Sequence, residues 1–173
     1  MQGKRPERIQ TDRLCLRAIT DSDEESMVAA LTCAEISKTY MIPEFSSPQE
    51  AKPLFERLKN LSAGQDRFVY GIYWEEKLIG WVNEVEDTGE AMELGFVITP
   101  TYQRQGFATE TLSACMQALF AAGYHTVKTG AFEENIASIR VMEKCGMVRM
   151  TETETIEYRG NTHRCILFEK NKP

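Results

Sequence analysis

Apolar and polar residues alternate most regularly in the middle of the chain, from Met92 to Thr99. This period of two predicts a strand with one apolar face, and the strand ends before Pro100 because proline cannot donate to a sheet ladder. From Thr109 onward, apolar residues recur every three or four positions, which predicts a helix that ends at Gly123. The centre of the chain is therefore expected to be a strand, a short loop and a long helix.

Shorter runs of the same two periods predict further elements on both sides of this centre. On the N-terminal side, where residues 1–10 are expected to be loosely held, they predict a strand at 13–18, a helix from the capping cluster at 20–23 through Leu31, a helix at 48–64 and a hairpin at 68–82. On the C-terminal side they predict a strand at 126–131, a helix at 135–146 that crosses over to a parallel neighbour, and a hairpin at 153–168. Together these elements predict a mixed α/β sheet with helices on its faces.

Length and composition are those of one ordinary globular domain. With 173 residues, 42% of them apolar, the chain is long enough for one core and short for two. No internal repeat or low-complexity linker divides residues 1–173, so they are expected to form a single domain. No apolar run reaches the ~18 residues of a membrane span, and residues 1–8 lack the apolar centre of a secretory signal. These features predict a cytoplasmic protein with no membrane partner.

Charge and cysteine content narrow the classes of partner. The net charge of −6 argues against nucleic acid, because phosphate contacts need clustered lysines and arginines, and it is compatible with a cationic substrate such as an amine. The five cysteines form no Cys-x-x-Cys pair and are expected to be reduced and partly buried. Neither His125 nor His163 has metal-ligand spacing to a cysteine or carboxylate, so no metal site is expected.

The loop between the central strand and the long helix, residues 103–109, has the features of an anion site. Gly106 permits a sharp turn and a close approach by a ligand. The first N–H groups of the following helix favour an anion, and Arg104 adds a positive charge. The loop lacks the Gly-Lys-Ser/Thr of a Walker loop and the spacing of a dinucleotide fingerprint. We therefore interpret it as a cradle for pyrophosphate.

The same residues resemble a known family. The pattern Gln103-x-x-Gly106-x-Ala108 resembles the Gln/Arg-x-x-Gly-x-Gly/Ala signature of the GNAT acetyltransferase superfamily. It follows Glu-Leu-Gly-Phe at 93–96 and precedes Ala-Thr-Glu at 108–110. Residues 11–17 resemble the opening of the Rim-type (RimJ/RimL-like) branch, which includes N-terminal acetyltransferases of ribosomal proteins. The resemblance covers about residues 11–170. It implies a mostly antiparallel central sheet with helices on both faces and a split near the central strand.

The resemblance also implies that acetyl-CoA is the cosubstrate. In the family, the cradle holds the pyrophosphate, the adjacent strand pairs with the pantetheine arm, and an Asn-x-x-Ser motif adds further contacts. A backbone N–H freed by the split can stabilise an oxyanion, an effect worth ~3 kcal/mol. Gly95 fits a bulge, a close backbone approach, or packing against a bulky neighbour. The implied binding residues are Phe96, Val97, Ile98, Gln103, Arg104, Gln105, Gly106, Phe107, Ala108, Thr109, Asn135 and Ser138.

Glu93 and Ser138 are the candidates for catalysis. Family members often place a general base near the position of Glu93, and Glu84 is the alternative. Many members also carry a tyrosine that protonates the departing thiolate, but Met142 occupies that position here. Ser138 lies one helical turn earlier on the same face. It is either the replacement donor, a cofactor contact, or a helix-start serine that bonds its own backbone.

The implied reaction is direct transfer of acetyl from the thioester to a primary amine, without a covalent enzyme intermediate. A protein N-terminus, a polyamine and another small amine all remain open as acceptors, because acceptor recognition lies in variable loops. Glu35 and Glu44 are either attractors of a cationic acceptor or solvated loop carboxylates. A homodimer through a sheet edge is compatible with the sequence. The alternative function is a non-catalytic acyl-CoA-binding sensor or regulatory module, which the missing tyrosine favours.

Overall fold

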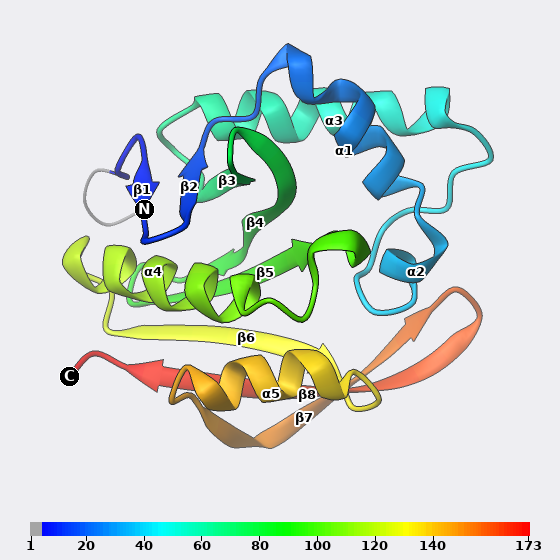
Figure 1. Ribbon diagram of the computed structural model, residues 1–173. Helices are drawn as coiled ribbons and strands as arrows, with labels where there is room; N and C mark the ends of the chain where they lie inside the picture. The colour runs from blue at the N-terminus through cyan, green and yellow to red at the C-terminus, as the bar shows by residue number, and fades with distance from the viewer. Residues whose placement is uncertain (1–4) are drawn as a thin grey trace.

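The strands of the computed structural model, which describes residues 5–173, form one eight-stranded sheet (Figure 1). Their order in the sheet is β1-β2-β3-β4-β5-β6-β8-β7. The strands are β1 (Ile9–Gln10), β2 (Leu14–Arg17), β3 (Val69–Trp74), β4 (Lys77–Asp87), β5 (Ala91–Ile98), β6 (Thr126–Phe132), β7 (Val148–Tyr158) and β8 (Asn161–Asn171). The α-helices are α1 (Glu24–Leu31), α2 (Ala34–Ser37), α3 (Pro48–Ala63), α4 (Phe107–Ala121) and α5 (Ile136–Lys144).

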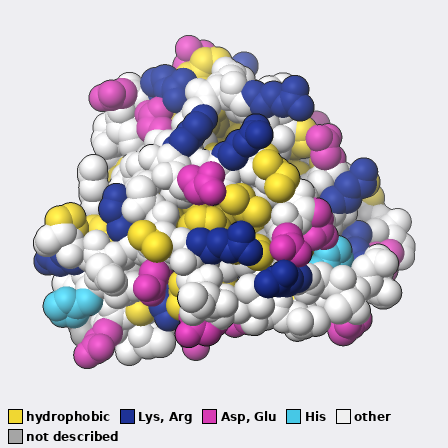
Figure 2. Space-filling view, turned by 90° about the horizontal axis from the view of Figure 1, so that it is seen from below, with side chains coloured by type: hydrophobic (Ala, Val, Ile, Leu, Met, Phe, Trp, Pro, Cys, Tyr) yellow, Lys and Arg dark blue, Asp and Glu magenta, His cyan; other side chains and the backbone are white. Residues whose placement is uncertain are grey.

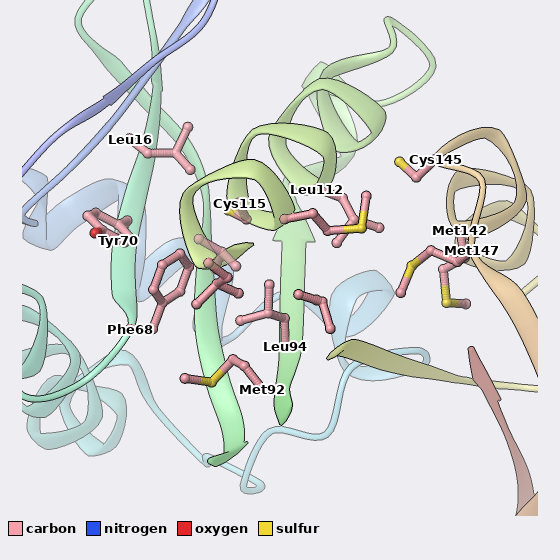
Figure 3. Close-up of a cluster of buried hydrophobic side chains, with 14 of the residues drawn as sticks. Leu16, Phe68, Tyr70, Met92, Leu94, Leu112, Cys115, Met142, Cys145 and Met147 are labelled. Carbon is pink, nitrogen blue, oxygen red and sulfur yellow. The ribbon is translucent and has the colours of Figure 1, made fainter. Parts of the chain in front are cut away.

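Helices cover both faces of the sheet, as predicted, and each face has its own apolar cluster. Neighbouring residues on a strand point to opposite faces, and on β5 Leu94 belongs to one cluster while Val97 belongs to the other. The larger cluster packs strand side chains against α4 and α5 and includes Leu112 and Met142 (Figure 3). The smaller cluster packs Val97 against side chains of α1, α2 and α3.

The sheet splits beside its central strand. β5 pairs with β6 only from Ala91 opposite Thr126 to Leu94 opposite Thr129. Beyond that point β5 continues to Ile98 with only β4 beside it, while β6 continues with only β8 beside it. The predicted split is therefore confirmed, and it exposes the edges of two strands that point into the same gap.

Among the described strands, β5 and β6 are the one parallel pair, and every other pair of neighbours is antiparallel. The crossover between them is α4 (Figure 1). The prediction that α5 connects two neighbouring parallel strands is wrong, because β8 lies between β6 and β7 and is antiparallel to both. The last strand of the chain inserts there, a long-range pairing that local periodicity does not report.

The prediction of a loosely held N-terminus is wrong for residues 5–10. Arg5 is 2% exposed, and its guanidinium donates to the carbonyls of Ser62, Gly64 and Arg67. These carbonyls lie at and beyond the C-terminus of α3, where a cation is favoured. Residues 1–4 lie outside the described residues. The expectations of a loosely held N-terminus and of no secretory signal are therefore untested for these four residues. Within residues 5–173, no helix is long and apolar enough to cross a membrane.

Candidate active site

A cavity of about 1220 Å³ opens where β5 and β6 separate. Its walls include residues 94–98 of β5 and 129–132 of β6, the stretches that flank the split. Val141, which packs on the cluster beneath α4 and α5, and Tyr40, which packs on the opposite cluster, both line the cavity. The cavity therefore passes through the sheet. All the residues predicted to bind the cosubstrate or to catalyse line it, with the exception of Gln105.

The predicted anion cradle, residues 103–109, forms one end of this cavity. Gly106 precedes α4 with a φ of +82°, and no side chain caps the helix there. The first N–H groups of an α-helix have no partner within the helix, so they are available to an anion. Arg104 has a φ of +63°, which is unfavourable for a residue with a side chain. Gln103 supports the loop by donating from Nε2 to the Ile98 carbonyl at 2.8 Å.

The start of α5 forms the adjoining wall. The Asn135 side chain accepts a hydrogen bond from the Ser138 N–H and donates from Nδ2 to Ser138 Oγ at 3.0 Å. Asn135 is therefore the N-cap of α5, as the sequence predicted. Because Ser138 Oγ accepts this bond, its own proton remains available to a group inside the cavity.

Glu93 lies on the face of the sheet opposite α4 and α5, in a cluster of charged side chains. Its partner across β4 is Glu86 and its partner on β6 is Lys128. Burial, followed by the charges of Glu154 and Glu86, raises the pKa of Glu93, and Lys128 opposes that rise. The cavity lining at this end also includes Glu35. A half-buried carboxylate with a raised pKa is suited to accept a proton from a cationic group.

A bulge on β4 sets this arrangement. Glu84 pairs with Leu94 and Glu86 pairs with Glu93, so Val85 is the extra residue. The bulge is on β4 and not at Gly95, so that proposal for Gly95 is wrong. A Cβ on Gly95 would lie 3.3 Å from Cε2 of Tyr40. The glycine therefore makes room for a bulky neighbour, which was one of the alternatives offered by the sequence.

Glu84, the alternative base, lies away from the cavity. Its side chain is 6% exposed and forms an ion pair with Arg67. It also accepts a hydrogen bond from the Phe68 N–H at 2.6 Å. These partners commit Glu84 to holding the start of β3, so Glu93 is the better-placed carboxylate.

The family's tyrosine position is occupied by a core residue. Met142 is 0% exposed and lies within the larger apolar cluster (Figure 3). A phenol that sequence reasoning missed, Tyr40, lines the cavity from the opposite face and donates to Asn83 Oδ1. Its ring contacts Trp81 edge-on at 5.7 Å, and burial raises its pKa, which keeps it protonated. Residue 40 lies within an irregular part of the sequence, residues 34–47, where no periodicity could have identified it.

Two further side chains in the cavity wall, a thiol and a hydroxyl, bear on the chemistry of the site. Cys165 lines the cavity, but burial and the charges of Glu154 and Glu93 raise the pKa of its thiol to about 11. A thiol that stays protonated is a poor nucleophile, which argues against an acetyl-cysteine intermediate. Thr129 pairs with Leu94 at the last step before the split, and its buried hydroxyl has no hydrogen-bond partner within residues 5–173. An unused polar group at this position fits a polar ligand that threads the split.

Charge divides the cavity. Arg104, Arg140 and Lys144 line it near the cradle and α5, whereas the four glutamates at 35, 86, 93 and 154 line the far end. Figure 2 shows a face on which Lys and Arg side chains surround an apolar area beside scattered acidic side chains. The described residues contain no group of three or more His, Cys, Asp or Glu side chains that could hold a metal ion.

Comparison with known proteins agrees with this geometry. Residues 13–148 match the family model described as the acetyltransferase (GNAT) domain. The chain is 31% identical over 143 residues to the uncharacterized N-acetyltransferase YnaD of Bacillus subtilis (strain 168), covering 82% of both chains. It is 28% identical to the uncharacterized N-acetyltransferase YoaA of the same organism, covering 89% of this chain and 90% of that protein.

A solved structure shares the whole fold. It is RimL, a ribosomal L7/L12 alpha-N-protein acetyltransferase, in complex with coenzyme A. The match has a TM-score of 0.82 at 18% identity and covers 95% of this chain and 98% of RimL. Because the family model spans most of the chain, and because YnaD is related over most of its length, the chain belongs to the GNAT acetyltransferase family and is an acyltransferase.

Proposed function

We propose that this protein transfers an acetyl group from acetyl-CoA directly to a primary amine. The observation that carries the proposal is the path of a single cavity. It begins at the anion cradle before α4, passes through the split between β5 and β6, and ends beside Glu93. An elongated, phosphate-bearing donor and a cationic acceptor can thus meet from opposite faces of the sheet.

The residues that line the path fit the parts of coenzyme A. The free N–H groups at the start of α4 and the side chain of Arg104 would hold the pyrophosphate. The edge of β5 at residues 96–98 faces the split and would pair with the amide-containing arm. Asn135, Ser138 and the unpartnered hydroxyl of Thr129 would supply further hydrogen bonds.

Glu93 would act as the general base, directly or through a water molecule. Acetyl-CoA supplies the activated acetyl thioester. An ammonium with a pKa of about 8 to 10 must lose its proton before its nitrogen can attack a carbonyl carbon. Glu93 accepts that proton, a new N–C bond forms, and the C–S bond breaks to leave a thiolate. The nitrogen then loses its second proton, which neutralises the thiolate directly or through the Ser138 hydroxyl, and Glu93 returns its own proton to solvent.

The remaining charges would be met by groups at the split. The peptide N–H groups of β5 beyond Leu94 have no β6 partner, and one of them can stabilise the developing oxyanion. Ser138 has a proton available for the thiolate. A thiol has a reference pKa of about 8.5, so its thiolate leaves readily even with a weak donor.

The acceptor end favours a cationic substrate. The charges of Glu154 and Glu86 act on Glu93, Lys128 partly offsets them, and Glu35 lines the same cavity. RimL acts on the N-terminus of a ribosomal protein, but a polyamine or another small amine would suit this end equally well. The acceptor is therefore proposed as a class, a primary amine.

A non-catalytic acyl-CoA-binding module is the second candidate. The observation that favours it is Met142, which fills the tyrosine position with a buried apolar side chain. The exposure of Glu93 to the cavity and the available proton of Ser138 favour the enzyme.

Calorimetric titration with acetyl-CoA, combined with a thiol-release assay, tests the proposal. The assay would present peptides with free N-termini, polyamines and small monoamines. We expect micromolar binding and thiol release with one acceptor class, and a roughly 10²- to 10⁴-fold loss of kcat in Glu93→Gln with binding retained. Glu90→Gln, at an exposed position, is the matched control. Binding without release for any acceptor would support the sensor, and no binding would reject the cradle.

A further inference from the structure

An arginine from the N-terminal segment contacts the anion cradle from outside the cavity. Arg13 lies just before β2 and does not line the cavity. It donates from Nη1 to the Gln105 carbonyl at 2.9 Å and from Nε to Glu110 at 2.7 Å. Its guanidinium also lies 4.4 Å from the centre of the Phe107 ring. Every one of these partners belongs to the cradle or to the first turn of α4.

The bond to Gln105 has a consequence inside the cavity. In a trans peptide, the C=O of one residue and the N–H of the next point in opposite directions. Arg13 draws the Gln105 carbonyl outward, so the Gly106 N–H is turned toward the opposite side of the loop. In agreement with this, Gln105 does not line the cavity, while Arg104 and Gly106 on either side of it do.

The cradle needs such a restraint because its backbone is strained. Arg104 has a positive φ of +63°, a conformation that is unfavourable for a residue with a side chain. Gly106 is also in the left-handed region, at +82°. Strained conformations persist when surrounding contacts determine them, and Arg13 supplies contacts to the residues on both sides of Gly106.

The charge of Arg13 is already matched, so it is not free for a phosphate. Glu110 accepts hydrogen bonds from the Arg13 backbone and side chain and from Thr11. Burial opposes ionisation of Glu110, but these bonds hold its pKa below the ordinary value. Arg13 and Glu110 thus form a fixed ion pair that ties the N-terminal segment to the start of α4.

We propose that Arg13 is a positioning residue for cosubstrate binding: it holds the cradle with its N–H groups aimed at the pyrophosphate. The proposal rests on the proposed use of acetyl-CoA. It assigns a role to the Thr-x-Arg-Leu segment at residues 11–14, which the catalytic proposal leaves unused. The role is distinct from that of Arg104, which lines the cavity and can contact the phosphate itself.

Two acetyl donors separate this role from a merely structural one. Acetyl-CoA carries the pyrophosphate, whereas S-acetylpantetheine has the same thioester arm without it. We expect Arg13→Ala to raise the Kd for coenzyme A about tenfold, the equivalent of one lost charge-assisted hydrogen bond. Its kcat/KM with S-acetylpantetheine should equal that of the wild type. Arg13→Lys, which keeps the charge but loses the fork geometry, should be intermediate.

Arg17→Ala is the matched control. Arg17 lies four residues later, pairs with Glu76, and stacks on Tyr73 without touching the cradle. Its Kd for coenzyme A should match that of the wild type. If Arg13→Ala proves unstable, Glu110→Gln weakens the same ion pair while preserving shape, and its Kd should also rise.

Three results would overturn the inference. One is an unchanged Kd for coenzyme A in folded Arg13→Ala or, where that variant is unstable, in Glu110→Gln. Another is an equal loss of activity with both donors, which would indicate general damage. A third is a rise in Kd for Arg17→Ala as large as that for Arg13→Ala. Failure of the wild-type protein to bind coenzyme A would instead reject the proposed function on which the inference rests.

Discussion

Glu93 shows how one residue depends on charges contributed by several elements. Glu86 on β4, Glu154 on β7 and Lys128 on β6 all act on its carboxylate. Glu35 on α2 and Cys165 on β8 line the same cavity. Burial makes the largest contribution, and the two glutamates add to it, so the pKa of Glu93 is raised. A base with a raised pKa holds a proton more readily, at the cost of being protonated at mildly acidic pH.

The pH dependence of activity tests this environment. A base works when unprotonated, so kcat/KM is lost as pH falls through its pKa. Glu154→Gln removes a negative neighbour and lowers the pKa of Glu93, so the acid limb should move to lower pH. Lys128→Met should move it to higher pH. Glu157→Gln, exposed on the same hairpin, should leave it in place. A shift in the opposite direction for Glu154→Gln would contradict the assignment of Glu93.

At the scale of elements, the C-terminal hairpin holds a loop that lines the cavity at its proposed acceptor end. The tip of β7 and β8 lies beside α2 and the chain that follows it (Figure 1). Tyr158 Oη lies 2.8 Å from the Ser37 carbonyl and accepts from the Ile42 N–H. Arg159 donates to Ser37 Oγ and to the Ile42 carbonyl. The loop between these anchors carries Tyr40, which lines the cavity.

Releasing this loop should weaken acceptor binding alone. In the double variant Tyr158→Phe and Arg159→Ala, we expect the KM for the amine to rise severalfold, since the loss of two or three hydrogen bonds frees the loop. The Kd for coenzyme A should stay the same, because the cradle is formed by other elements. Hydrogen exchange measured by mass spectrometry should rise in residues 37–43. Thr162→Ala, on the same hairpin, is the control. Unchanged exchange in the double variant would show that Tyr158 and Arg159 do not hold the loop.

Local periodicity accounts for the elements that were predicted well. The alternation through β5, the helical spacing of α4 and the cap at Asn135 each act within a few residues, so these elements and the cradle could be identified from sequence. Tyr40 could not, because its position depends on a hairpin about 120 residues later in the chain. The insertion of β8 and the bulge at Val85 also depend on pairing partners that are distant in sequence.

At the scale of the whole molecule, net charge conceals an internal division. The chain carries a formal charge of −6, yet Arg104, Arg140 and Lys144 line the cavity near the cradle and α5. Glutamates gather at the other end. Under the proposed function, each end would attract a ligand of opposite sign, an anionic donor on one face of the sheet and a cationic acceptor on the other. Net charge alone would have suggested that the protein repels a phosphorylated cosubstrate.

Ionic strength should act on both ends of the cavity. The Debye length falls from about 10 Å at 0.1 M salt to about 3 Å at 1 M, so attraction between partly exposed charges weakens. We expect the KM for acetyl-CoA and the KM for a polyamine acceptor each to rise severalfold between these salt concentrations, with kcat nearly constant, because the chemical step takes place between groups already in contact. S-acetylpantetheine, which lacks phosphate, is the control, and its KM should respond little. If salt changed kcat while leaving both KM values constant, the charges at the two ends of the cavity would not be what draws the substrates in.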